Sequence, residues 1–140
     1  MSAVQKIADT LEREGQKTLA FFEDLLHLFF CLFSEVDGSI SKLIKRIVCD
    51  VTGVPEDFDI DRWNARYTME MSAHDRDYLL AEFASRRAAT VAMVRGFSEA
   101  DLAASGRHPF LGQAHVKDML KLMYVHLMQH QRDIRNVLDR

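Results

Sequence analysis

The chain has 140 residues, of which 48% are hydrophobic and 28% charged, and its formal net charge is -3. This length suits one hydrophobic core, so we predict a single domain over residues 1–140. The composition excludes an intrinsically disordered chain. Basic residues form no run or stripe, so we expect no nucleic-acid partner. The chain contains only 6 glycines and 2 prolines, and so few breakers favour helices over a many-stranded sheet.

The N-terminal segment has the apolar spacing of a helix that faces a bundle. Its stripe consists of Val4, Ile7, Leu11, Thr18, Phe22, Leu25 and Phe29. From Leu25 to Phe33 the sequence LLHLFFCLF is apolar on every side of a helix. This run is too short for a membrane span, and the charged stretch before it excludes a signal peptide. We therefore expect no membrane partner. A helical segment that is apolar on every side is predicted to be buried on every side or to lie in an interface with a partner subunit.

Three further helices are predicted downstream. A short one runs from Ser39 or Ser41 to about Cys49, where a serine can cap its start. The glycine, proline and acids between residues 50 and 64 predict a loop, after which a long helix runs from about Asn64 to Arg95. A second loop contains a capped turn at residues 98–101, and the last helix runs from about Gln113 to Leu138. The prediction is an all-α fold, a four-helix bundle of up-down type with moderate loops.

The two cysteines, Cys31 and Cys49, are 18 positions apart and form no CxxC motif. This spacing predicts neither a cysteine metal site nor a disulfide scaffold. Free thiols are typical of a reducing compartment, so we predict a cytoplasmic protein.

The last predicted helix carries two histidines, His126 and His130, in the sequence YVHLMQHQRDI. Its apolar stripe consists of Val116, Leu120, Met123, Leu127, Ile134 and Val137. At about 100° per residue, His130 falls near the centre of this stripe and His126 about 40° away from it, so both rings are expected to face the bundle interior. Side chains at i and i+4 can converge on one metal ion. The alternative is a pair of hydrogen-bonded core histidines.

A third ligand is harder to find. His74 is expected to face solvent, and His108 and His115 fall in or near a loop. His27 lies in the apolar segment 25–33, and the other candidates near it are Cys31, Glu35 and Asp37. A catalytic zinc usually takes three protein ligands. The residues alone do not decide whether this chain has a third ligand.

The segments LIKRIVCDVTGVPEDFDIDRWN and SGRHPFLGQAHVKDMLKLMYVHLMQHQRDI resemble the DinB superfamily of bacterial four-helix-bundle proteins. The resemblance is strongest from Leu43 to the C-terminus, and the HPFLG loop followed by a helix with H-x3-H carries most of it. Relatives include bacillithiol S-transferases and mycothiol-dependent maleylpyruvate isomerase. The resemblance implies a homodimer, a divalent metal (zinc, nickel or iron) and a low-molecular-weight thiol as substrate.

In the family pattern, one histidine of the second helix and both histidines of the last helix hold the metal. His126 and His130 match the last two. The position of the first falls at about residues 30–32, where this chain has no histidine, and His27 stands a turn earlier. Either His27 serves as the third ligand or the site is incomplete.

Two functions from different classes follow. The first is a divalent-metal-dependent enzyme of the DinB type that transfers a thiol, with His126, His130 and His27 as metal ligands. The second is a degenerate, metal-free bundle that acts as a dimeric binding or stress-related scaffold. A di-iron carboxylate bundle fits poorly, because no predicted helix carries a Glu-x-x-His pair.

Overall fold

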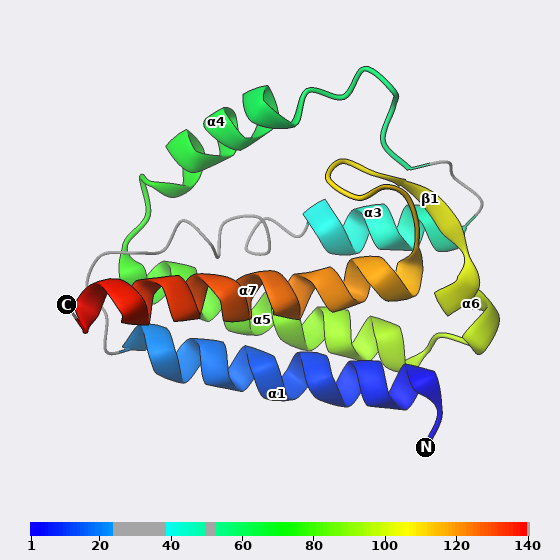
Figure 1. The fold of residues 1–140 in the computed structure, drawn as a ribbon, viewed down its shortest axis with the longest axis horizontal. Helices are drawn as coiled ribbons and strands as arrows, with labels where there is room; N and C mark the ends of the chain where they lie inside the picture. The colour runs from blue at the N-terminus through cyan, green and yellow to red at the C-terminus, as the bar shows by residue number, and fades with distance from the viewer. Residues whose placement is uncertain (24–38, 50–52, 140) are drawn as a thin grey trace.

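The computed structural model describes residues 1–23, 39–49 and 53–139. Helices α1 (Ala3–Glu23), α5 (Arg76–Arg95) and α7 (Val116–Leu138) lie side by side, with α1 in contact with both others. Helix α3 (Ser39–Val48) packs against α7 on the other side (Figure 1). Each of the predicted helices thus has a counterpart, and the all-α class is confirmed. The apolar segment 25–33 and its predicted interface lie outside the described residues.

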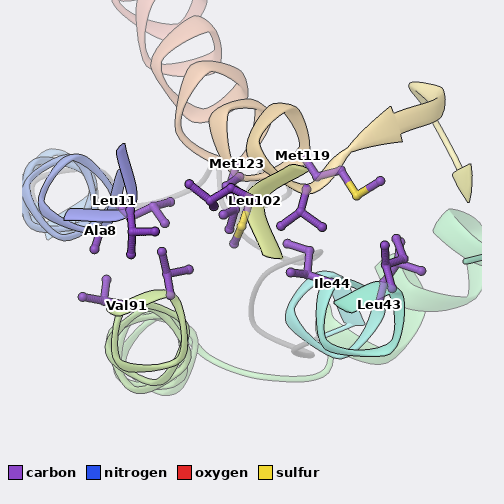
Figure 2. Packing of buried hydrophobic residues seen from close by; sticks show 13 residues of the cluster. Ala8, Leu11, Leu43, Ile44, Val91, Leu102, Met119 and Met123 are labelled. Atoms are coloured by element: carbon purple, nitrogen blue, oxygen red, sulfur yellow. The ribbon is translucent and has the colours of Figure 1, made fainter. Parts of the chain in front are cut away.

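The main hydrophobic core is shared by helices that are far apart in the sequence. Figure 2 shows Ala8 and Leu11 of α1, Val91 of α5, Ile44 of α3 and Met119 of α7 converging on one apolar cluster. The short helix α6 (Glu99–Ala103) adds Leu102. A second cluster joins the other ends of the long helices through Phe22, Leu79, Phe83 and Leu127. Burial of these side chains is the main contribution that holds the helices together.

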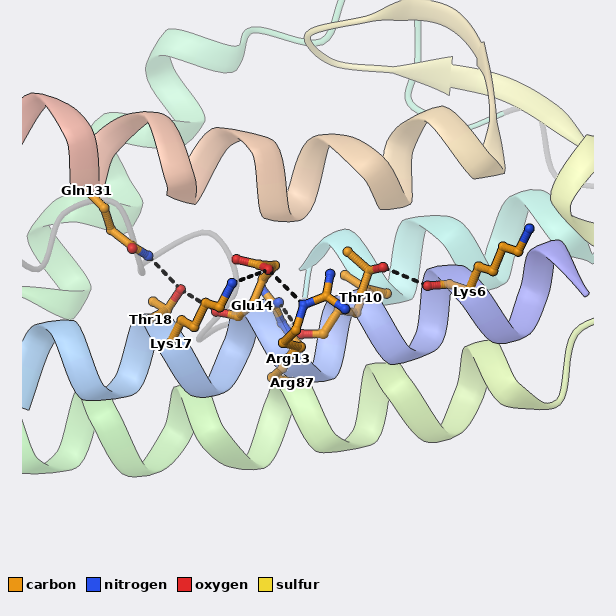
Figure 3. Close-up of polar contacts among 9 residues, drawn as sticks. Lys6, Thr10, Arg13, Glu14, Lys17, Thr18, Arg87 and Gln131 are labelled. Atoms are coloured by element: carbon orange, nitrogen blue, oxygen red, sulfur yellow. Dashed lines mark hydrogen bonds and ion pairs between the residues drawn. The ribbon is translucent and has the colours of Figure 1, made fainter. Parts of the chain in front are cut away.

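Some of the polar contacts between these helices are also buried (Figure 3). The Gln131 side-chain amide on α7 donates a hydrogen bond of 2.8 Å to Oγ1 of Thr18 on α1. The guanidinium of Arg87 on α5 donates one of 2.8 Å to the carbonyl oxygen of Leu11. Gly15 makes room for Arg87, since a Cβ atom at Gly15 would come within 2.7 Å of Arg87 Cγ. These contacts fix the register of α1 against both neighbours.

The prediction of one continuous helix from Asn64 to Arg95 is wrong, because the structure has two helices there, α4 (Ile60–Met71) and α5. Asp75 caps α5 by accepting a hydrogen bond of 2.8 Å from the backbone N–H of Tyr78. Ser72 ends α4 by donating its hydroxyl to the Met69 carbonyl. Both side chains compete with the backbone for hydrogen bonds, which favours helix ends over a helix interior. Helix α4 begins earlier than predicted because Asp59 caps it.

The segment 105–115, predicted as loop and helix start, forms a β-hairpin of β1 (Ser105–His108) and β2 (Gly112–His115). His108 is buried at its turn, and its Nδ1 accepts hydrogen bonds from the N–H groups of Phe110 and Leu111, at 3.1 and 3.2 Å. Gly112 adopts a φ of +67°, which favours glycine. The capped turn predicted at residues 98–101 is confirmed by a capping box between Ser98 and Asp101.

Helix α4 differs from every other long element because it buries none of its residues. Figure 1 shows it standing apart from α7, on the side away from α1 and α5. None of the helices in the described ranges combines the length and hydropathy that crossing a bilayer requires.

Candidate functional site

A cavity of about 820 Å³ lies on the α4 side of α7, and it has the size typical of a small-molecule site. Residues from α7, α4, α3 and the hairpin turn line it. From α7 these are Met119, Leu122, Met123, His126, Leu127, His130 and Ile134, whose spacing of three and four residues forms one face of the helix. The cavity therefore borders the face of α7 on which Met119, Met123 and Leu127 also belong to the core clusters.

The histidines of this flank are in direct contact. Nε2 of His126 and Nε2 of His130 lie 2.7 Å apart, and the ring centroids are separated by 4.4 Å. Because two ring nitrogens can share one proton at this distance, one imidazole donates and the other accepts. The same pair of nitrogens points at one region of space, as the spacing of the two residues predicted.

The predicted direction of the two rings is wrong. His126 is exposed and His130 half-buried, and both line the cavity rather than the interior between α1, α5 and α7. The buried positions of α7 include Leu120, Leu127 and Gln131, whereas Val137 is 67% exposed. Gln131 belongs to the core because Thr18 satisfies its amide. The prediction used apolar residues alone and so left Gln131 out of the buried face of α7. As a result, the predicted buried face was centred too close to His130.

The electrostatic surroundings favour the neutral form of the His126 imidazole. Although the His126 side chain is exposed, neighbouring protein atoms remove part of the water around its ring and so lower its pKa, and the positive form of His130 beside it lowers that pKa further. At neutral pH His126 is therefore uncharged, which is the state that coordinates a metal. The two nitrogens would need to separate only slightly, to about 3.3 Å, to serve as neighbouring ligands of a tetrahedral zinc.

Within the part of the chain that the structure describes, no other histidine joins this pair. His74 is exposed and stacks on Tyr78 with ring centroids 4.1 Å apart, and Nδ1 of His115 hydrogen-bonds the Ala103 carbonyl at 2.8 Å. His108 lines the cavity, but its Nδ1 is occupied by the hairpin turn. His27, the remaining predicted ligand, lies outside the described residues, as do Cys31, Glu35 and Asp37.

The described residues thus supply two of the ligands that a metal would need. No group of three or more histidine, cysteine or acidic side chains with metal-binding geometry occurs within residues 1–23, 39–49 and 53–139. The donor chemistry of the pair fits zinc, nickel or iron, all of which accept imidazole nitrogen.

The opposite walls of the cavity carry residues that spacing did not identify. Helix α4 contributes Ile60, Trp63, Asn64, Tyr67 and Thr68, and α3 contributes Ser39, Ile40, Lys42, Leu43 and Arg46. Trp63 stacks on Tyr67 with centroids 4.5 Å apart, and Phe58 lies 6.4 Å from Trp63. The sequence signal for α4 was its apolar spacing, Ile60, Trp63 and Tyr67.

Helical bundles build ligand and metal sites from side chains on facing helices, and in this small α-helical protein an i, i+4 histidine pair faces a cavity between helices. A family model described as the DinB superfamily matches residues 42–134, which is more than half of the chain. The chain belongs to the DinB superfamily. Neither the curated proteins nor the solved structures include a significant match to it.

Proposed function

We propose that this chain is a divalent-metal-dependent DinB-type enzyme that transfers a low-molecular-weight thiol, with His126 and His130 as two of the metal ligands. The observation that carries the proposal is the 2.7 Å approach of the two Nε2 atoms at the wall of the 820 Å³ cavity. His27 is the proposed third ligand. A bound divalent ion would hold the thiol as thiolate at neutral pH.

The chain's own residues have defined parts in this proposal. His126 and His130 hold the site on one helix, so that its geometry follows from the rigid backbone of α7. Trp63 and Tyr67, which stack on each other, line the opposite side of the cavity. We also propose a cytoplasmic homodimer, and light scattering that shows a monomer at micromolar concentration would contradict the dimer.

The second candidate is a metal-free dimeric scaffold, for binding or in a stress response. It is favoured by the hydrogen bond that the two imidazoles make with each other, since the pair satisfies itself without an ion. It is also favoured by the number of candidate metal ligands, because the described part of the chain brings only the two histidines together.

Metal uptake by untagged protein separates the two candidates. The apo protein is incubated with Zn²⁺ or Ni²⁺, desalted, and analysed for metal per chain. We expect the unaltered chain to retain metal, and His126→Ala or His130→Ala to weaken retention at least about tenfold. The matched control is His74→Ala, which removes an exposed histidine outside the cavity and should leave metal retention unchanged.

Two results would contradict the metal proposal: no retained metal in the unaltered chain, or equal retention in His126→Ala. The His27→Ala variant then tests the third ligand, since it loses metal only if His27 coordinates. Transfer activity is followed as metal-dependent consumption of a small thiol by a bimane electrophile. Activity that is unaffected by chelation would favour a different mechanism.

A further inference from the structure

The charge of the cavity wall differs from that of the chain. The whole sequence has 21 acidic residues against 18 lysines and arginines. The described residues that line the cavity include Lys42 and Arg46 but no aspartate or glutamate. In an acidic protein, two cations and no acid among the described lining residues favour a negatively charged ligand.

These two cations are available for a ligand. Lys42 and Arg46 stand one turn apart on α3, and both are exposed. Neither forms an ion pair or side-chain hydrogen bond with any described residue, whereas Arg95 pairs with Glu12 at 2.8 Å and Arg107 with Glu56 at 2.7 Å. A guanidinium can hold a carboxylate or a sulfonate through two parallel hydrogen bonds, and a neighbouring ammonium adds to the attraction.

The rest of the wall is apolar and aromatic. Trp63, Tyr67 and Phe58 form a continuous aromatic group on the α4 side, and Phe110 from the hairpin turn is 74% exposed. Helix α4 has no buried residue, so this apolar face is turned to the cavity instead of the core. Exposed aromatic surface in a cavity of this size favours a ligand with an apolar body.

We propose that the cavity binds an amphipathic organic anion. Its acidic group would lie at Lys42 and Arg46, and its aromatic or aliphatic body against Trp63 and Phe58. The inference builds on the proposed site because it names the chemistry of the molecule that this cavity takes. It does not require the metal, so it can be tested on metal-free protein, and its failure would leave the metal-uptake experiment unaffected.

Trp63 is the only tryptophan of the chain, so its fluorescence reports directly on the cavity. The probes are phenylbutyrate, phenylbutanol and phenylbutylamine, which share one apolar body and differ in charge. We expect a saturable change of Trp63 emission with the acid. Binding of the alcohol should be about tenfold weaker, because it loses the charge-assisted hydrogen bonds. Binding of the amine should be weaker still.

Charge removal provides the variant test. The double variant Lys42→Gln, Arg46→Gln should bind acid and alcohol with similar affinity, and its unchanged affinity for the alcohol shows that the cavity is still folded. The control is Lys45→Gln, which removes an exposed cation from the same helix at a position that does not line the cavity. Equal affinity of the unaltered chain for acid and alcohol would overturn the proposal, as would an equal loss in Lys45→Gln.

Discussion

Similar apolar residues have different roles on the two sides of α7. On the side of α1 and α5, aromatic and aliphatic side chains such as Phe83 and Leu120 are completely buried. On the side of α4, the apolar residues Trp63 and Tyr67 face a cavity, and their helix buries nothing. The comparison teaches that an amphipathic pattern identifies a face but not its partner. We assign folding stability to the first side and ligand recognition to the second.

Truncation of one aromatic residue on each side should give the largest contrast. Phe83→Ala is expected to lower the free energy of unfolding by about 3–5 kcal/mol, because Phe83 is fully buried in the second cluster. Trp63→Ala is expected to lower it by less than about 1 kcal/mol, as is usual for residues outside a packed core. Urea denaturation followed by circular dichroism measures both values. Similar losses in the two variants would break the assignment.

A smaller effect is expected where α1 meets α5. An alanine inside a helix is usually more stable than glycine by about 0.5–1 kcal/mol. At Gly15 the added methyl group would meet Arg87 Cγ at 2.7 Å, so Gly15→Ala should instead destabilise the fold, by about 1–3 kcal/mol. The neighbouring exposed position Gln16→Ala serves as the control and should change stability by less than about 0.5 kcal/mol. A stabilised Gly15→Ala variant would show that α1 and α5 are packed less closely than described.

The smallest effect concerns pH and the hairpin turn that borders the cavity. Burial lowers the pKa of His108 below its usual value of 6.5, and its unprotonated Nδ1 accepts two backbone hydrogen bonds. Because the unfolded state binds the proton more readily, the stabilising contribution is complete above pH 6.5 and is lost as the pH falls below it. His108→Asn keeps an acceptor that does not titrate, so its stability should fall less on acidification from about pH 7 to pH 5. Parallel pH profiles of the two proteins would contradict this account.

Local signals predicted much of the fold. The regular apolar spacing of α1 and α7 and the serine–aspartate capping box at residues 98–101 were sufficient to predict the corresponding elements. The break between α4 and α5 was missed because the chain contains neither glycine nor proline there. The only signals were the hydrogen-bonding side chains of Ser72 and Asp75.

The candidate site was predictable only in part. The spacing of His126 and His130 predicted that the rings would meet, and they do. The direction in which the two rings point depends on the burial of Gln131. That burial requires a hydrogen bond to Thr18 of α1, a residue 113 positions earlier in the sequence. The cavity itself depends on where α4 lies relative to α3 and α7, and that arrangement arises from tertiary packing that no local pattern encodes.

Anomalous diffraction from crystals of metal-reconstituted, untagged protein tests the central claim most directly. We predict one metal peak in the cavity, with Nε2 of both His126 and His130 at about 2.0–2.1 Å from it. The hydrogen bond of 2.7 Å between the two rings would then be lost. The opposite result is an intact imidazole pair at saturating metal with no peak beside it, and this would contradict the assignment of α7 as a metal-binding helix.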